Sequence, residues 1–372
     1  MIIAVNTRLR KETQPEGYES FVFETLKRLT EKFSQHQFIF ISDRPCDKGF
    51  IFAKNVTQII ARPGIKNSLQ LQYWFNYKIP AVLRRHKADV FLSMEGICSI
   101  RTKKPQCLLL SDLCFIRHPL LLKKSQAGFY KKFTAAFLLK AKSIATLSAY
   151  SKSVLIDQYK LSTDDVDVIT PGIDVIFKPL GLDEKEINKE RYAVGKEYFL
   201  FSGNSNLHSN IINLLKAFSI FKQRQKSNML LLIAGNPDES FTKDLNTFKY
   251  KNEVIVLADL SKEELAKITA SAYALVYPVL YSDLALPPLQ AMQCGVPVIA
   301  AYTGALRSIC GNAALYVNPD DFKDIAENMM LVFKDEDKAK ELVKAGKAIS
   351  AKYHWDKTAG LLMQSILKAY NS

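Results

Sequence analysis

The segment YSDLALPPLQAMQCGVPVIAA, residues 281–301, combines residue types and spacing that could bind a phosphorylated ligand. Two consecutive prolines fit the first turn of a helix, where their missing N–H groups cost no hydrogen bond. A helix start attracts anions, because its free amides and its dipole both present positive charge there. Ser282, Asp283 and Gln290 add oxygens that could accept hydrogen bonds from ligand hydroxyls. The segment predicts either a ligand-binding helix or an ordinary packed helix start.

Two other strand-to-loop transitions have a similar composition. Gly203 follows the run YFLF in the stretch FSGNSNLHSN, and Gly235 follows a run of leucines in IAGNP. A glycine at a strand end lets the backbone approach a ligand closely, and Asn210 could cap a helix whose start favours an anion. Glycine is also common at strand ends that bind nothing. The three strand ends together, more than any one of them, favour a nucleotide-type ligand.

Short β-rich runs alternate with amphipathic helical patterns, which is typical of βαβ units and parallel sheets. We expect strands at 2–6, 38–42, 56–60, 90–93, 106–110, 143–147, 166–170, 198–202, 229–234, 254–257, 274–277 and 296–300. We expect helices at 18–33, 69–86, 129–142, 210–225, 261–271, within the opening segment, after Asp320, and at 355–370. The polar stretch 178–195 is the best candidate for a linker. The pattern predicts two Rossmann-like, doubly wound α/β domains, with ligands bound at the carboxyl ends of the strands, in a cleft between the two domains.

Composition narrows the class of protein. A length of 372 residues suits two domains, and 48% hydrophobic residues indicate a globular protein with a large core. The six cysteines lie far apart and lack metal-ligand spacing, so we expect reduced core cysteines, a cytoplasmic protein and no metal. No apolar run approaches the roughly 18–20 residues that span a bilayer. The sequence MIIAVNT predicts a buried first strand and no signal peptide.

Charge is unevenly distributed. The net charge is +14, of which residues 1–170 carry +13, with 27 basic and 14 acidic residues. This asymmetry favours an anionic partner for the first half, such as an acidic lipid surface, a nucleic acid or a phosphorylated substrate; a basic surface without a partner is the alternative. The stretch 123–142 alternates lysines with aromatic residues. It predicts contact with an anionic membrane, or a helix whose aromatic residues simply face the core.

The opening segment resembles the hallmark of the GT-B-fold family 4 glycosyltransferases (glycosyl transferases group 1). These retaining enzymes transfer a sugar from a nucleotide-sugar donor. The matching stretches are LPPL, AM, CG and PV within the opening segment, EGYESFVFETLKRL (16–29), SDLCFIRHP (111–119), residues 144–179 and GNAALYVNPDD (311–321). Trp355 and its helix resemble the last segment of this fold, which crosses back onto the first domain. The resemblance implies an acceptor-side domain at 1–172 plus 355–372, and a donor domain at 173–354.

The sequence departs from the family pattern at several polar positions. The two motif glutamates correspond to Ser282 and Gln290, and Gly-x-Gly has become Asp283-Leu284-Ala285. The basic pair that contacts the diphosphate corresponds to His208-Ser209. In the acceptor-side domain, the expected His is Ser111 and the expected Glu is Ala149. Gln290 keeps an oxygen that can accept hydrogen bonds from ribose, but it lacks the negative charge of a glutamate, which would strengthen them. With His208-Ser209 in place of the basic pair, a cation that would stabilise the departing diphosphate is missing.

The resemblance assigns roles to individual residues. It implies catalytic roles for Asp112, Ser282 and Asp283. It implies donor-binding roles for Gly203, Asn204, His208, Ser209, Gly235, Leu260, Leu284, Ala285, Leu286, Pro287 and Gln290. It implies acceptor-binding roles for Gly17, Tyr18, Glu95 and Arg117. No metal and no bound cofactor are expected, and the nucleotide sugar serves as co-substrate.

Two functions therefore stay open. The first is a retaining, metal-independent glycosyltransferase in polysaccharide or envelope glycan synthesis, acting on a saccharide or a lipid-linked acceptor, in the cytoplasm and peripherally at the inner face of the membrane. The second is a catalytically degenerate GT-B protein that serves as a partner or nucleotide-sugar-binding subunit. Nucleic-acid binding lacks a recognised motif, and we do not expect it.

Overall fold

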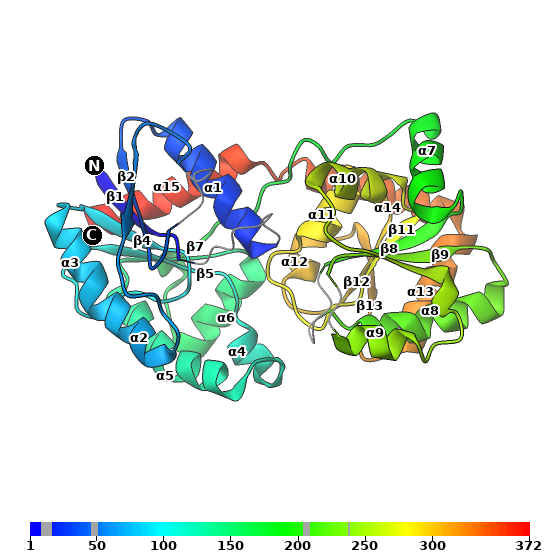
Figure 1. Cartoon of the computed structure of the whole chain (residues 1–372), viewed down its shortest axis with the longest axis horizontal. Helices are drawn as coiled ribbons and strands as arrows, with labels where there is room; N and C mark the ends of the chain where they lie inside the picture. Colours follow the sequence, from blue (N-terminus) through cyan, green and yellow to red (C-terminus); the bar gives the residue numbers. More distant parts are fainter. Residues whose placement is uncertain (9–16, 46–50, 204–208, 237–238) are drawn as a thin grey trace. The chain divides into compact units, whose positions relative to one another are not determined.

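A computed structural model describes residues 1–8, 17–45, 51–203, 209–236 and 239–372. The chain forms two compact units. The first unit contains Met1–Gly172 and Trp355–Ser372, and the second contains Ile173–His354 (Figure 1). Each unit is a parallel α/β sheet covered by helices on both faces, which confirms the Rossmann-like fold class.

The first sheet has the strand order β3-β2-β1-β4-β5-β6-β7, and all pairs are parallel. The strands are β1 (Ile2–Asn6), β2 (Gln37–Ser42), β3 (Val56–Ile60), β4 (Val90–Ser93), β5 (Gln106–Leu110), β6 (Ser143–Thr146) and β7 (Val166–Val168). The helices are α1 (Tyr18–Lys32), α2 (Ser68–Tyr73), the π-helix η2 (Trp74–Lys78), α3 (Ile79–Arg85), α4 (Cys114–Arg117), α5 (Lys124–Lys140), α6 (Ala149–Tyr159) and α15 (Trp355–Asn371). Helices α1 and α15 lie over one face, and α2, α3 and α5 lie over the other (Figure 1).

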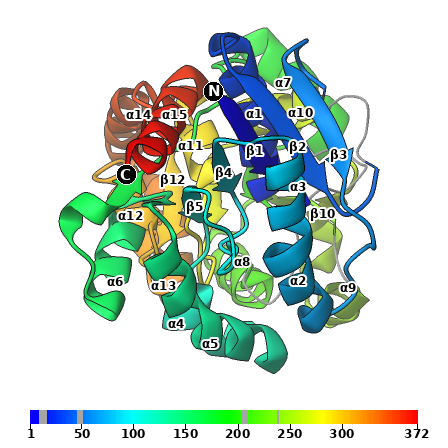
Figure 2. The same ribbon diagram turned by 90° about the vertical axis from the view of Figure 1, so that its left-hand side faces the viewer.

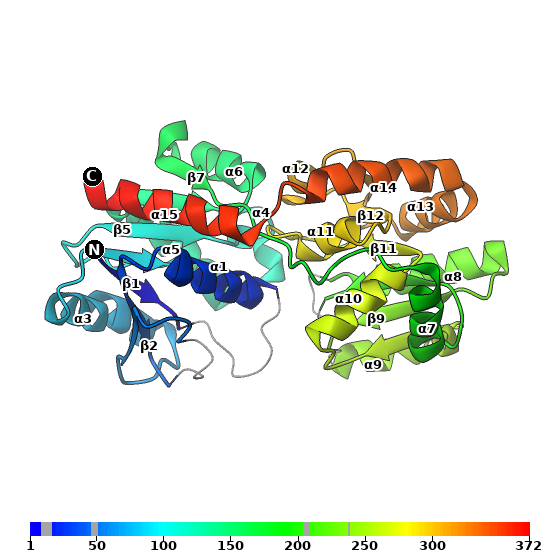
Figure 3. The same ribbon diagram turned by 90° about the horizontal axis from the view of Figure 1, so that it is seen from above.

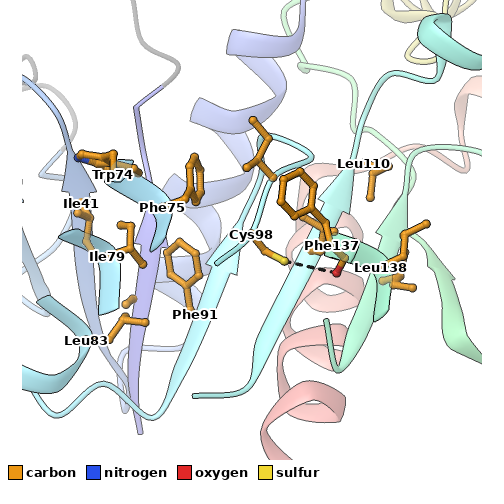
Figure 4. Packing of buried hydrophobic residues seen from close by; sticks show 14 of the residues in the cluster. Ile41, Trp74, Phe75, Ile79, Leu83, Phe91, Cys98, Leu110, Phe137 and Leu138 are labelled. Atoms are coloured by element: carbon orange, nitrogen blue, oxygen red, sulfur yellow. Dashed lines mark hydrogen bonds between the residues drawn. The ribbon is translucent and has the colours of Figure 1, made fainter. Parts of the chain in front are cut away.

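The core under this second helical layer explains why these segments are helical. Trp74, Phe75 and Phe91 are almost completely buried, and Phe137 packs with them (Figure 4). The Cys98 thiol, which also lies in this core, donates a 3.4 Å hydrogen bond to the Phe137 carbonyl. Large apolar side chains at helical spacing are thus removed from water against the sheet, which drives the packing of the layer.

The second sheet has the order β10-β9-β8-β11-β12-β13, again all parallel. Its strands are β8 (Tyr198–Ser202), β9 (Leu230–Ala234), β10 (Val254–Leu257), β11 (Ala274–Tyr277), β12 (Val298–Ala301) and β13 (Ala314–Val317). Its helices are α7 (Leu182–Ala193), α8 (Ile211–Gln225), α9 (Glu239–Leu245), α10 (Lys262–Ser271), α11 (Leu286–Gln293), α12 (Leu306–Cys310), α13 (Phe322–Lys334) and α14 (Glu336–Ser350). Figure 1 shows α8 and α13 on one face and α10 and α11 on the other.

The twelve expected strands are confirmed, with bounds that shift by at most two residues. Strand β13 and helices α4, α6, α7, α9, α12 and α14 are additional. The prediction of a linker at 178–195 was wrong, because α7 occupies most of it. The polar side chains of this helix form ion pairs: Lys189 Nζ lies 2.5 Å from Glu197 Oε1 and 2.8 Å from Glu186 Oε1.

The last helix, α15, packs beside α1 in the first unit (Figure 3). Its Trp355 is buried, and Thr358 Oγ1 donates a 2.7 Å hydrogen bond to the Thr170 carbonyl. Ser365 Oγ donates to Asp167 Oδ2 at 2.8 Å, and Lys368 Nζ lies 3.1 Å from Asp167 Oδ1. The helix is therefore fixed to the last strand of the first sheet by buried apolar surface and by a polar network.

Candidate functional site

The carboxyl edge of the second sheet contains a topological switch point. Strands β8 and β11 are neighbours, but the connections after them leave in opposite directions, toward β9 and β12. Loops diverge at such a point and leave room for a ligand. Helices α8 and α11 both begin at this edge, so their positive dipole ends lie on the two sides of the switch point.

The glycines after β8 and β9 shape this edge. Gly203 N donates to the Ala234 carbonyl and Gly235 N donates to the Leu257 carbonyl, both at 2.9 Å. Each glycine extends the sheet ladder by one bond and then turns with a φ of 143° or 151°. Residues with a Cβ rarely adopt such angles, so both turns depend on glycine.

Asn210 fixes the start of α8. Its Nδ2 donates to the carbonyls of Pro278 (2.8 Å) and Pro319 (2.7 Å), which follow β11 and β13. Ser209 is buried beside it. The predicted donor-binding residues Asn204 and His208 lie outside the described residues.

The β11–α11 loop is held by backbone contacts. Ser282 Oγ accepts a 3.4 Å hydrogen bond from Ala285 N, and Ala285 has a left-handed conformation with φ 51°. The Ser282 carbonyl accepts from Ala305 N at 3.1 Å, and Thr303 Oγ1 donates to the Val279 carbonyl at 3.0 Å. The loop after β12 therefore clamps the predicted catalytic loop in place.

Two tyrosines support the side chains of this loop. Tyr281 Oη donates a 2.6 Å hydrogen bond to Asp283 Oδ2, and both residues are buried. Burial raises the pKa of Tyr277 to about 12, although a hydrogen bond with Ser282 opposes the shift. The Tyr277 ring stacks on Phe201, which comes from β8. Asp283 and Ser282 are therefore both tied to aromatic residues of the switch point.

The first turn of α11 offers a ligand few amides. Pro287 and Pro288 have no N–H, and Leu289 N donates to the Ala285 carbonyl at 3.3 Å. Leu286 N is the remaining amide of this turn. Gln290 is partly buried one turn later, and helical side chains lean toward the helix start, which directs its amide to the same end.

The remaining predicted donor-binding residues also lie along this edge. Leu284 is partly buried in the β11–α11 loop. Leu260 is partly buried after β10, and its neighbour Asp259 N donates to Asn236 Oδ1 at 3.3 Å. That bond joins the loops after β9 and β10.

The first unit gathers a second polar cluster at the carboxyl edge of its own sheet. Glu95, after β4, is buried; its Oε2 accepts from Asn6 Nδ2 at 2.8 Å and from Arg8 Nε at 3.0 Å. Tyr18 Oη donates to the Met94 carbonyl. Burial raises the pKa of Tyr18, and a hydrogen bond with Ser111 opposes the rise. The structure thus brings Tyr18 and Glu95 together, but the Glu95 carboxylate already accepts hydrogen bonds from Asn6 and Arg8.

The other predicted acceptor-side residues are more exposed. Asp112 is exposed, and its Oδ1 accepts from Cys114 N at 2.7 Å at the start of α4. The pKa of Tyr130 is raised by burial and by Asp112, while Arg8 opposes the rise. Gly17 caps the start of α1 with φ 52°, and Arg117 is exposed at the far end of α4.

Sequence reasoning missed three parts of these sites. Arg8 and Tyr130 join the polar cluster of the first unit, and the loop around Gly304 holds the β11–α11 loop of the second unit. Arg8 follows β1 by two residues, which is the same kind of strand-end position that identified Gly203. Position after a strand was thus an available signal for Arg8, whereas Tyr130 comes from a helix and carried no such signal.

The aromatic residues of 123–142 face the core. Phe137 is buried, and Phe129, Tyr130 and Phe133 pack against the same core cluster. The alternative in which the aromatic residues face the core is confirmed, because their rings pack against this cluster, and contact of the helix with a membrane stays a prediction. The lysines of the helix, such as Lys131, remain exposed.

Within the residues that the structure describes, no group of three or more His, Cys, Asp or Glu side chains is placed to hold a metal ion. The five described cysteines are free and buried. None of the helices in the described ranges combines the length and the apolar character needed to cross a bilayer.

Comparison with known proteins identifies the second unit. Residues 183–349 match the family model described as glycosyl transferases group 1. This unit belongs to that family. The O-antigen chain mannosyltransferase RfbU of Salmonella typhimurium is 30% identical to the chain over 206 residues, which are 53% of this chain and 54% of the relative. The O-antigen chain mannosyltransferase B of Escherichia coli is 24% identical over 63% of this chain and 62% of its own length.

Solved structures extend the likeness to the fold of the whole chain. WaaG, a glycosyltransferase involved in lipopolysaccharide biosynthesis, superposes with a TM-score of 0.79 at 13% identity, over 98% of this chain and 99% of that one. Anabaena HepE in complex with UDP and glucose gives 0.76 at 14% identity, over 99% of both chains. The chain therefore has the GT-B fold.

The two substituted polar side chains of the β11–α11 loop have partners in the structure. Ser282, which the resemblance places at a motif glutamate, supports its own loop through Ala285 and Tyr277. Asp283, which the resemblance places at a motif glycine, has its carboxylate turned toward Tyr281. Both substituted side chains therefore have structural partners within the loop that carries them.

The Tyr281–Asp283 bond should contribute to the stability of this domain. Removing the hydroxyl in Tyr281→Phe takes a donor from a buried carboxylate, so we expect a loss of about 1–3 kcal/mol in the free energy of unfolding. Denaturant titration measures it. The control Tyr302→Phe, at an exposed ring on the same edge, should change the value by less than about 0.5 kcal/mol. Equal, small effects for both variants would contradict the role of the bond.

Proposed function

We propose that the chain is a retaining, metal-independent hexosyltransferase that moves a sugar from a nucleotide-diphosphate sugar to a saccharide or lipid-linked acceptor. The observation that carries the proposal is the switch point of the group 1 domain, where the starts of α8 and α11 flank the glycine turn at Gly203. Two helix starts can bind a diphosphate without a metal. The O-antigen mannosyltransferases among the relatives support a role in polysaccharide or envelope glycan synthesis.

Individual residues have distinct roles in this proposal. The Leu286 amide and the start of α8 stabilise the diphosphate as it departs, and the Gly203 turn lets the ligand approach the sheet edge closely. Gln290 accepts hydrogen bonds from the ribose hydroxyls. Asp283 and Ser282 lie beside the donor sugar, and Asp112 accepts a hydrogen bond from the acceptor hydroxyl. No bound cofactor takes part, and the nucleotide sugar is the co-substrate.

A second candidate function is nucleotide-sugar binding without transfer. One observation favours it: the two motif glutamates are replaced, and the nearby Asp283 carboxylate is buried against Tyr281. A GT-B protein of this kind would act as a binding subunit or a partner of an active enzyme. In either case we propose that the protein works in the cytoplasm, peripherally at the inner face of the membrane.

Gln290→Ala tests the donor site. Losing two neutral hydrogen bonds should weaken the binding of a nucleotide sugar about tenfold, measured by calorimetry. Gln293→Ala is a matched control, because Gln293 Nε2 donates to the Asp174 carbonyl at 3.3 Å on the same helix. An equal loss in both variants would contradict the assignment of Gln290.

Release of the nucleoside diphosphate separates the two candidate functions. A transferase should release it from the donor that it binds, and the anomeric configuration of the product, read by NMR, should match that of the donor. Binding without any release, in the presence of membrane-derived glycan acceptors, would favour the binding subunit. Inversion of configuration would contradict the retaining mechanism.

A further inference from the structure

The two sides of the switch point in the second sheet differ in the room that they leave for a nucleoside. On the side of β12, the Ser282 carbonyl accepts from Ala305 N at 3.1 Å, and a Cβ on Gly304 would lie 2.7 Å from the same oxygen. Backbone contacts therefore close that side. On the side of β9, the strand ends in Gly235, which has no side chain and turns with a φ of 151°. A nucleoside attached to a diphosphate at the switch point thus extends toward β9 and β10.

The loops after β9 and β10 form one connected surface on that side. Asp259 N donates a 3.3 Å hydrogen bond to Asn236 Oδ1, which joins the two loops. Strand β10 is the edge strand of the sheet, and Figure 2 shows it on the side of the second unit away from β12. It lies two strands from β8, which is about 10 Å at the usual spacing of neighbouring strands. A nucleoside attached to a diphosphate at β8 is long enough to reach it.

One charged side chain is available to the base at this edge. Among the described residues between β8, β9 or β10 and the helix that follows each of them, Asp259 is the only charged one; residues 203, 209–210, 235–236, 258 and 260–261 are uncharged. Asp259 is exposed and has a left-handed backbone with φ 51°, which its short polar side chain tolerates. The described part of this edge therefore offers the base a carboxylate and no cation.

We infer that Asp259 selects guanine as the base of the donor nucleotide. Guanine presents two adjacent donors, N1–H and the N2 amino group, which match the two oxygens of a carboxylate. Uracil and thymine present one N–H between two carbonyl oxygens, which a carboxylate repels. Adenine and cytosine present one amino group beside a ring nitrogen that is an acceptor. Among these bases, only guanine forms a bidentate pair with Asp259. The inference rests on the proposed function, because it requires a nucleotide sugar at this site.

Calorimetry on the full chain with GDP, inosine diphosphate, UDP and ADP tests the inference. GDP should bind about tenfold more tightly than UDP or ADP, and about tenfold more tightly than inosine diphosphate, which lacks the N2 amino group. Asp259→Asn should weaken the binding of GDP about tenfold and reduce its preference over inosine diphosphate. Asparagine tolerates the left-handed backbone, and the bond to Asn236 comes from the main chain, so the variant keeps the loop.

The sign of the change distinguishes recognition of the base from general electrostatics. If the carboxylate made no contact with the base, its neutralisation would raise the affinity for every anionic nucleotide, because it would remove a repulsion. We expect the affinity for GDP to fall instead, and the affinity for UDP not to fall. Asp244→Asn is the matched control, since it removes an exposed aspartate from α9 in the same unit, and it should leave the affinity for GDP unchanged.

The outcomes separate this inference from the proposed function. Tighter binding of UDP or ADP than of GDP would overturn the choice of base and leave the proposed function intact. An Asp259→Asn protein that binds GDP as well as the wild type does, or an equal loss in Asp244→Asn, would overturn the role of Asp259 alone. Binding of no nucleotide and no nucleotide sugar would overturn both proposals. Thermal melting without ligand checks that each variant is folded.

Discussion

Gly172→Ala should lower the free energy of unfolding of the first unit by more than about 3 kcal/mol, at or above the upper end of the usual cost of overpacking. A Cβ at this position would lie 2.5 Å from the Trp355 indole and 2.6 Å from Trp355 Cα. A flexible side chain could move away, but these are a backbone atom and a buried ring. The first turn of α15 would have to leave the sheet.

Gly360→Ala is the matched control for this prediction. It lies in the same helix, and nothing is within 4 Å of its added Cβ. Alanine is a better helix former than glycine, so this variant should gain about 0.5–1 kcal/mol. Thermal unfolding measures both, since 1 kcal/mol shifts the Tm by about 2–4 °C in a unit of this size. A Gly172→Ala protein as stable as the wild type would show that α15 can relax at no cost.

Gly304→Ala should abolish nucleotide-sugar binding by displacing the loop that carries Ser282. A Cβ at Gly304 would lie 2.7 Å from the Ser282 carbonyl oxygen, and the residue has φ +53°. The left-handed backbone costs alanine about 1 kcal/mol and the clash adds about 1–3 kcal/mol. Because the Ser282 carbonyl is the acceptor for Ala305 N, relief of the clash breaks the clamp on the β11–α11 loop. Calorimetry with a nucleotide sugar measures the loss.

Gly295→Ala separates the clash from the backbone strain. Gly295 lies at the far end of α11 with φ +73°, and the atom nearest to its added Cβ is a lysine carbon 3.6 Å away. This variant should lose a similar amount of stability from strain but should keep its affinity for the nucleotide sugar. Unchanged binding in Gly304→Ala would mean that the loop does not form the donor site.

The sequence predicted the strands well, because each is a short β-rich run between polar segments. The opening segment also predicted the start of α11 correctly, because consecutive prolines fit a helix only in its first turn. The helix α7 was missed because most of its residues are polar, and a polar composition does not distinguish such a helix from a linker; in the structure its Lys189 and Arg191 form ion pairs. The helix expected at 69–86 contains the π-helical turn Trp74–Lys78, which no simple periodicity indicates.

Side-chain partnerships could not be predicted. The sequence predicted a role in the site for Ser282 and Asp283. Only the fold shows that Tyr277 is the partner of Ser282 and that Tyr281 is the partner of Asp283. Glu95 was expected to meet an acceptor, and the structure pairs it with Arg8 across neighbouring strands. Contacts of this kind depend on strand order. Arg8 and Glu95 are 87 positions apart in the sequence, but they meet because β1 and β4 are neighbours in the sheet.

The central claim is that the group 1 domain binds a nucleotide sugar at the switch point between β8 and β11. Thermal unfolding of the full chain with UDP-, GDP-, ADP- and dTDP-sugars tests it most directly. At least one donor should raise the Tm, by an amount that corresponds to about 2.7 kcal/mol at a hundredfold excess over its Kd, and Gln290→Ala should reduce the shift. No shift with any of these donors would contradict the claim.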